Sequence, residues 1–203
     1  MSSATLGNLV TGSRRGTAYV PHDCTRCPLS HGRTQVVPGE GPSKPLAFFV
    51  GEAPGPDEDR LGRPFIGRAG NILRTNLRTS GWTEAEVWIT NSVKCFPNEP
   101  EGEKKRIRAP VPVEIEACRP HLAAELDALH PKLIVALGRT AAASLLGETP
   151  ALDEVHGTVV GSYRLVPVFV TFHPSGLHYR RGRMDEFVQD LRKAREMAVK
   201  MRT

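Results

Sequence analysis

The segment from residue 51 to residue 70 reads Gly51-Glu-Ala-Pro-Gly-Pro-Asp-Glu-Asp-Arg-Leu-Gly-Arg-Pro-Phe-Ile-Gly-Arg-Ala-Gly70. An apolar run at 46–50 precedes it and predicts a short buried strand, and the following residues, 71–80, have helical character. Open α/β sheets bind ligands where a strand ends in a loop before a helix. Glycines let the backbone approach a ligand closely, and prolines stiffen the loop. We therefore expect a ligand site at the carboxyl end of this strand.

The same segment carries four carboxylates and one aromatic ring. Glu52, Asp57, Glu58 and Asp59 lie too close together in the sequence to form a core, so they require water, a metal or a reaction. An acidic connection that only caps the next helix is the alternative. Phe65 favours a site, because an aromatic ring among glycines and arginines is costly to leave solvated and suits stacking on a flat ring.

A family resemblance extends beyond this segment. It is carried by residues 51–55, 58–59, 62–70, 89–95, 117–120 and 173–175. These motifs resemble those of the family 4 uracil-DNA glycosylases, the iron-sulfur branch of their superfamily, and the likeness spans residues 24 to 195. The resemblance implies a DNA repair enzyme that hydrolyses the N-glycosidic bond of uracil in DNA. Such an enzyme flips the base, releases free uracil and leaves an abasic site.

Length and charge agree with a DNA-binding globular protein. The 203 residues suit one domain, expected at 21–203 after a flexible leader at 1–20 that is rich in Gly, Ser and Thr. The net charge of +5 favours a polyanionic partner, here uracil-containing DNA, single- or double-stranded. No apolar run reaches membrane-spanning length and no secretory signal is recognisable, so we expect a cytoplasmic protein without membrane contact. Nothing in the sequence asks for more than a monomer.

The remaining pattern predicts the fold class. Strands are expected at 87–90, 132–137 and 166–171, and helices at 113–129, 141–146 and 185–201. Strands followed by helices predict a three-layer α/β/α sandwich with a short, mainly parallel central sheet, as in the uracil-DNA glycosylase superfamily. The helix start at 138–140 could receive a phosphate, but it is also a common connection. Segments 51–65, 91, 104–108 and 173–177 should then meet at one carboxyl edge of the sheet.

The four cysteines are candidate metal ligands. Cys24 and Cys27 form a Cys-x-x-Cys pair, Cys95 follows a predicted strand, and Cys118 lies in a predicted helix. In a reducing compartment such cysteines bind metal more often than they form disulfides, and the spacing alone favours zinc. The family resemblance implies a 4Fe-4S cluster on these positions instead, with zinc as the alternative. The implied role is structural, because it would fix the N-terminal segment and the loop after Cys95.

Base recognition is expected at the end of the strand at 87–90. The resemblance makes Asn91 the residue that reads uracil. A buried amide offers one acceptor and two donors, which can match the N3–H and O4 edge of uracil, whereas cytosine presents the opposite pattern. An asparagine that only caps a strand end or a turn is the alternative. The resemblance implies a substrate-binding set of Ala53, Gly55, Asp57, Glu58, Phe65 and Asn91.

Catalysis is assigned to Glu52 and His173. Cleavage leaves a uracil anion and an electron-poor sugar, so donors to uracil O2 and a carboxylate near the sugar both lower the barrier. The resemblance places His173 at O2, and Glu52 is the first choice for stabilising the sugar or activating water, ahead of Asp57 and Glu58. It also implies that Ser175 contacts DNA and that Leu177 is the apolar wedge that fills the gap left by an extruded base.

A basic segment lies within 96–112, which we expect to be a long loop. Its cations, Lys104, Lys105, Arg106 and Arg108, are expected to contact DNA phosphates, although a solvated charge run is the usual explanation. The segment is similar to the insert of the UdgX-type branch, whose Lys-Arg-Arg-Ile-His run supplies a histidine that becomes attached to the deoxyribose.

This chain departs from the UdgX pattern at three positions. Arg108 stands where the attacking histidine would be, and a guanidinium stays protonated at neutral pH and cannot be a nucleophile. Ala53 replaces a glutamine and Cys95 replaces a histidine. We therefore predict a glycosylase that turns over. The alternative is a UdgX-like protein that captures uracil-DNA tightly or covalently and turns over little.

Overall fold

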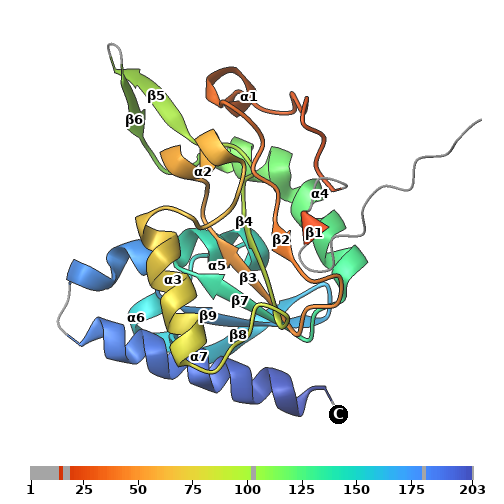
Figure 1. The fold of residues 1–203 in the computed structure, drawn as a ribbon, viewed down its shortest axis with the longest axis vertical. Helices are drawn as coiled ribbons and strands as arrows, with labels where there is room; N and C mark the ends of the chain where they lie inside the picture. The colour runs from red at the N-terminus through yellow and green to blue at the C-terminus, as the bar shows by residue number, and fades with distance from the viewer. Residues whose placement is uncertain (1–13, 16–18, 102–103, 180–181, 203) are drawn as a thin grey trace, which may run out of the picture.

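The computed structural model describes residues 14–15, 19–101, 104–179 and 182–202. Its centre is a seven-stranded sheet with the order β1-β2-β4-β3-β7-β9-β8 (Figure 1). The four central strands are parallel to one another, and the outer strands pair antiparallel. The strands are β1 (Arg14–Arg15), β2 (Glu40–Gly41), β3 (Ala47–Gly51), β4 (Val87–Asn91), β7 (Leu133–Leu137), β8 (Thr158–Tyr163) and β9 (Val166–Thr171).

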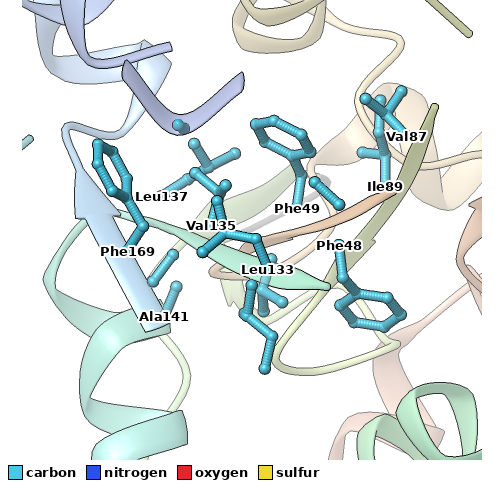
Figure 2. Packing of buried hydrophobic residues seen from close by; sticks show 14 of the residues in the cluster. Phe48, Phe49, Val87, Ile89, Leu133, Val135, Leu137, Ala141 and Phe169 are labelled. Carbon is cyan, nitrogen blue, oxygen red and sulfur yellow. The ribbon is translucent and has the colours of Figure 1, made fainter. Parts of the chain in front are cut away.

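The central strands are buried on both faces, as continuous apolar runs require. Every residue of β3, β4 and β7 is buried. Successive side chains point to opposite faces, so Phe48 and Phe49 enter the two halves of the core from neighbouring positions (Figure 2). The Phe49 ring meets the ring of Trp82 edge to face, with 5.3 Å between centroids.

Helices cover both faces of the sheet, which confirms the three-layer α/β/α sandwich (Figure 1). Helices α3 (Arg68–Thr79) and α7 (Arg183–Lys200) pack against each other on one side, and α4 (Pro112–Leu129) and α5 (Arg139–Leu146) contact each other on the other. The short helices are α1 (Leu29–Gly32), α2 (Pro56–Leu61), α6 (Leu152–Val155) and the 3-10 helix η2 (Pro174–Tyr179). Within the described residues, no helix is long and apolar enough to cross a membrane.

Several elements differ from the sequence-based expectation. The segment at 96–112 is not a loop throughout, because β5 (Asn98–Glu101) and β6 (Lys104–Ile107) form a separate antiparallel hairpin that projects from the body of the molecule (Figure 1). The edge strand β8 was not expected, since its exposed and half-buried residues give no apolar run. The leader expected at 1–20 lies mostly outside the described residues, but Arg14–Arg15 pair with β2 and Val20 is buried. The sheet therefore includes residues that precede position 21.

Candidate functional site

A cavity of about 660 Å³ lies at the carboxyl ends of β3, β4 and β9. This is the edge at which parallel α/β sheets bind ligands. Residues from the expected site segments line it together with the end of the β5–β6 hairpin. The predicted site residues that line the cavity are Glu52, Ala53, Gly55, Asp57, Glu58, Phe65, Asn91, Arg108, His173 and Ser175.

Glu52 directly follows β3, and its side chain is held from a neighbouring helix. Thr140 Oγ1 donates a hydrogen bond of 2.5 Å to Glu52 Oε2 from the first turn of α5. A second cavity of about 280 Å³ adjoins Glu52 on the side of α5 and shares His173 and Ser175 with the first. The carboxylate therefore stands between two solvent-filled spaces with one oxygen fixed. The sequence analysis did not assign a role to Thr140, and its only signal was the helix start at 138–140.

Asn91 ends β4 opposite Gly51, with which it is paired in the parallel ladder. Its side chain is buried, and its Oδ1 has no hydrogen-bond partner among the described residues. A Cβ at position 51 would lie 2.5 Å from this oxygen and 2.4 Å from Phe65 Cζ, so only glycine fits there. An unpaired buried acceptor costs free energy, and the residue that carries this one lines the main cavity. The Asn91 amide therefore lies at the cavity wall with its oxygen enclosed against Gly51.

Phe65 forms the adjoining wall in a strained backbone conformation. Its φ is 52°, in the left-handed region that a bulky residue rarely adopts. The carbonyl oxygen accepts a hydrogen bond of 2.9 Å from Arg74 Nε, which fixes this conformation. The ring is almost fully buried, and its centroid lies 6.0 Å from that of His173. Phe65 thus offers a flat apolar surface beside the Asn91 amide.

His173 follows β9 and is held in one tautomer by its own turn. The Ser175 backbone N–H donates to His173 Nδ1 over 3.2 Å, and the Ser175 hydroxyl lies 2.8 Å from the same atom. An acceptor at Nδ1 leaves the ring proton on Nε2. Burial lowers the pKa of His173 below its ordinary value of 6.5, although the Glu52 carboxylate acts in the opposite direction. At neutral pH the ring is therefore an uncharged donor.

Glu58 holds the loop and does not face the cavity as a free carboxylate. Its Oε1 accepts hydrogen bonds from the backbone N–H groups of Ile66 (3.0 Å) and Gly67 (2.8 Å), and its Oε2 accepts one from Gly55 (3.1 Å). Three backbone donors on one buried carboxylate give the segment from 55 to 67 a single conformation. Asp57 is exposed instead and pairs with Arg60 at 3.4 Å. Glu58 thus stabilises the loop, whereas the Asp57 carboxylate is exposed to solvent.

The four cysteines come together at the N-terminal side of α4. Cys95 and Cys118 are buried in one apolar cluster with Cys27, and all four thiols are free. Burial raises the pKa of Cys27 and Cys95 and raises that of Cys118 to about 12. Arg33 Nη1 donates to Cys95 Sγ over 3.3 Å, and the Lys94 backbone N–H donates to Cys118 Sγ over 3.2 Å. These donors stabilise negative charge on sulfur.

The donor set of this cysteine site fits a thiolate-bound metal group. Buried thiols with raised pKa values stay protonated unless a cation compensates their charge, and N–H donors to sulfur are typical around iron-sulfur clusters. Across residues 19–101, 104–179 and 182–202, no three histidine, cysteine, aspartate or glutamate side chains are already placed to hold a metal ion.

Comparison with known proteins gives the family. A sequence profile described as the uracil DNA glycosylase superfamily matches residues 38–194. The chain belongs to this superfamily. It is 40% identical over 185 residues to a type-4 uracil-DNA glycosylase of Thermotoga maritima, covering 87% of this chain and 90% of that protein. A type-4 uracil-DNA glycosylase of Archaeoglobus fulgidus is 38% identical over 87% of this chain and 89% of its own. A type-5 enzyme of Pyrobaculum aerophilum is 30% identical over 80% of this chain and 82% of its own.

From the sequence, Leu177 and Arg108 were expected to contact DNA. In the structure, both side chains pack against other parts of the protein. Leu177 is 2% exposed and belongs to the main core, where η2 contacts α3 and α7. It is therefore not presented as a wedge in this conformation. Arg108 is tied to Glu114 by two hydrogen bonds of 2.8 and 2.6 Å and lies 3.8 Å from Glu99. This pairing holds β6 against the start of α4. The expectation that Arg108 contacts a DNA phosphate stays a prediction.

The other basic residues of the hairpin are less constrained. Arg106 is exposed, and its guanidinium pairs with Glu99 at 2.5 Å. An exposed pair of this kind contributes little and can be exchanged for a phosphate. Lys104 and Lys105 lie in β6, and their side chains are outside the described residues. The expectation that these two lysines contact DNA therefore stays a prediction.

Glu58→Ala should loosen the loop between α2 and α3. We expect a loss of about 1–3 kcal/mol of stability, because three partly buried N–H groups lose their acceptor. Hydrogen exchange at the amides of Gly55, Ile66 and Gly67 should become faster. Asp57→Ala is the matched control, since it removes an exposed carboxylate whose ion pair contributes at most about 1 kcal/mol. Unchanged exchange at these amides in Glu58→Ala would contradict the assigned role.

Proposed function

We propose that the protein is a uracil-DNA glycosylase that hydrolyses the N-glycosidic bond of uracil in DNA and releases the free base. The observation that carries this proposal is the buried Asn91 amide, whose Oδ1 has no hydrogen-bond partner among the described residues, at the wall of the main cavity beside Phe65. An amide next to a flat apolar wall can match the N3–H and O4 edge of a stacked uracil.

Selection of uracil over cytosine follows from the amide. With Oδ1 accepting from N3–H, the Asn91 amide nitrogen can donate to O4. Cytosine presents an acceptor at N3 and a donor at its amino group, so both contacts would set like groups against each other. A buried polar site rejects such a mismatch strongly, because its groups would be left unpaired.

The reaction breaks the bond between sugar C1′ and uracil N1. The bonding electrons leave with the base, and the charge is delocalised onto O2, where His173 Nε2–H can donate a hydrogen bond. The uncharged ring supplies this donor without loss of a proton. Water adds to C1′ and gives up a proton as uracil acquires one. Glu52, held by Thr140, stabilises the electron-poor sugar and accepts or orients the proton of the attacking water.

Turnover is favoured over covalent capture by the chemistry at the hairpin. UdgX-type capture needs a nucleophile at the position of Arg108, and a guanidinium does not supply one. Its pairing with Glu114 raises the pKa of Arg108 further, so it stays charged. We propose that the hairpin occupies the same position in the chain as the UdgX-like insert. Its role here is to bind single- or double-stranded DNA, and the protein acts in the cytoplasm. The cations of β6 support this role.

We further propose that Cys24, Cys27, Cys95 and Cys118 hold a 4Fe-4S cluster. The cysteine site described above supports this assignment, because Cys95 and Cys118 are buried in one cluster with the half-buried Cys27, and N–H groups donate to their sulfur atoms. When bound, the cluster supplies a structural cross-link between the N-terminal segment, the end of β4 and α4. Zinc is the competing occupant, since four thiolates also satisfy it.

The proposed reaction is tested with a labelled single-stranded oligonucleotide that carries one uracil. We expect many alkali-cleaved strands per protein molecule and no shifted band on a denaturing protein gel. Glu52→Gln should lower the rate about 100-fold or more while DNA binding is retained, because it removes the carboxylate that acts at the sugar. Glu116→Gln, an exposed site on α4, is the matched control. A band that resists denaturation, with little cleavable product, would establish capture instead.

The rate of uracil release should fall on the acid side of pH 6.5. The pKa of His173 is lowered from 6.5, so the ring stays neutral at pH 6.5 and above and becomes protonated only at lower pH. A proton on Nδ1 would face the Ser175 N–H and break the contact that orients the ring. The measurement is the pH dependence of single-turnover release between about pH 4.5 and 8. A loss of rate that begins above pH 6.5 would contradict this assignment.

The cluster is tested by colour and metal content. Protein purified without oxygen should be brown with broad visible absorption and contain about four iron atoms per chain. Cys95→Ser and Cys118→Ser should each lose this absorption and lower the stability of the folded chain. A colourless protein with about one zinc per chain would assign the cysteines to zinc instead.

A further inference from the structure

An exposed apolar side chain stands at the edge of the main cavity. Ile107, the last residue of β6, is 64% exposed and lines the cavity together with Arg108. Among the large apolar residues that the described chain leaves exposed, only Ile107 lines this cavity. Exposed apolar surface beside a ligand site usually meets a partner. If the basic segment at 104–108 were only a solvated run of charges, the exposure of Ile107 beside the cavity would have no explanation.

The base of the hairpin holds Ile107 firmly. On one side, Arg108 is fixed by Glu114, and its backbone N–H donates to Pro97 O over 3.3 Å. On the other, Asn98, which is directly opposite Ile107 in the ladder, donates from Nδ2 to Phe96 O (3.0 Å) and Gly32 O (3.2 Å). The Ile107 side chain thus lies at the base of the hairpin, where these contacts hold the backbone. Its position does not depend on the tip.

The surroundings of Ile107 suit a nucleic-acid backbone. Lys104, Lys105 and Arg106 precede it on the same strand, and Arg106 is exposed. Two glutamates, Glu99 and Glu101, stand opposite this strand in the ladder, and Glu99 pairs with Arg106 and Arg108. An apolar side chain flanked by cations at the mouth of a base pocket is the arrangement with which proteins enter a base stack.

The residue expected to fill a base stack is not available. Leu177 is buried in the core between α3, α7 and η2, and it could reach DNA only by leaving this packing. Ile107 needs no such rearrangement, since it is already exposed at the cavity. We propose that Ile107 is the apolar wedge that occupies the gap left in duplex DNA when the uracil nucleotide is extruded. This inference rests on the proposed glycosylase function and adds a duplex-specific residue to it.

A wedge matters only where a stack must be filled, so its loss should affect duplex and single-stranded DNA differently. We compare uracil release by Ile107→Ala on the same sequence as a duplex and as a single strand. We expect the ratio of the duplex rate to the single-strand rate to fall about tenfold relative to the parent protein. Val113→Ala, which truncates an equally exposed apolar residue on α4, should leave this ratio unchanged.

Two other outcomes would overturn the proposal. Equal losses on both substrates would make Ile107 part of the pocket wall, and no loss on either would make it a bystander. Leu177→Ala is measured in parallel together with its thermal unfolding. A selective duplex loss in Leu177→Ala, with the ratio unchanged in Ile107→Ala, would assign the wedge to Leu177.

A second measurement does not depend on catalysis. A 2-aminopurine base placed next to uracil in a duplex fluoresces more strongly when it is unstacked. We expect Glu52→Gln to raise this fluorescence on binding, and the double variant Glu52→Gln with Ile107→Ala to raise it less than half as much. An equal rise in both would overturn the wedge. If the parent protein released no uracil from either the duplex or the single strand, the proposed function would fail, while this signal would still decide the role of Ile107.

Discussion

A fully buried ion pair connects the two functional regions of the molecule. Lys94 Nζ lies 2.8 Å from Glu125 Oε2, and both side chains are completely excluded from solvent. Lys94 also donates to Thr90 Oγ1 and, over 3.0 Å, to the backbone carbonyl of Asn91, while Glu125 Oε1 accepts from Gly39 N–H over 3.0 Å. Every strong donor or acceptor of the pair is thus satisfied. Removing one partner of such a pair typically costs about 3–5 kcal/mol, because it leaves a buried charge alone.

The position of this pair links the cysteine site to the main cavity. The Lys94 side chain fixes the end of β4, where Asn91 faces the cavity, and its backbone N–H donates to Cys118 Sγ on α4. Cys95 follows directly in the sequence. Ala53, which lines the main cavity, also packs against the apolar cluster that contains the cysteines. The cysteine site and the wall of the main cavity are therefore connected through Lys94 and Ala53.

The sequence allowed the sandwich and most of the pocket to be predicted, because both follow from short-range pattern. Apolar runs gave β3, β7 and β9, and Asn91 and His173 stand at strand ends, where parallel sheets bring side chains together. Contacts between distant residues were not predictable in this way. The Thr140–Glu52 hydrogen bond joins residues 88 positions apart, and the pairing of Arg108 with Glu114 looks in sequence like ordinary alternating charge. The hairpin was missed because Pro100 and its charged neighbours give no alternation of apolar and polar residues.

The pocket also contains an electrostatic conflict that the fold resolves by position. In the proposed reaction Glu52 stands near an electron-poor sugar, yet a carboxylate repels the phosphates on either side of that sugar. The chain carries a net charge of +5. The positive charges of Arg106 and Arg108, however, are partly compensated by the carboxylates of Glu99 and Glu114. Of these two, only Arg106 is exposed enough to exchange its partner for a phosphate. In the proposed function the hairpin surface attracts DNA, while the Glu52 carboxylate lies at the end of β3, where an extruded nucleotide would bring its sugar close.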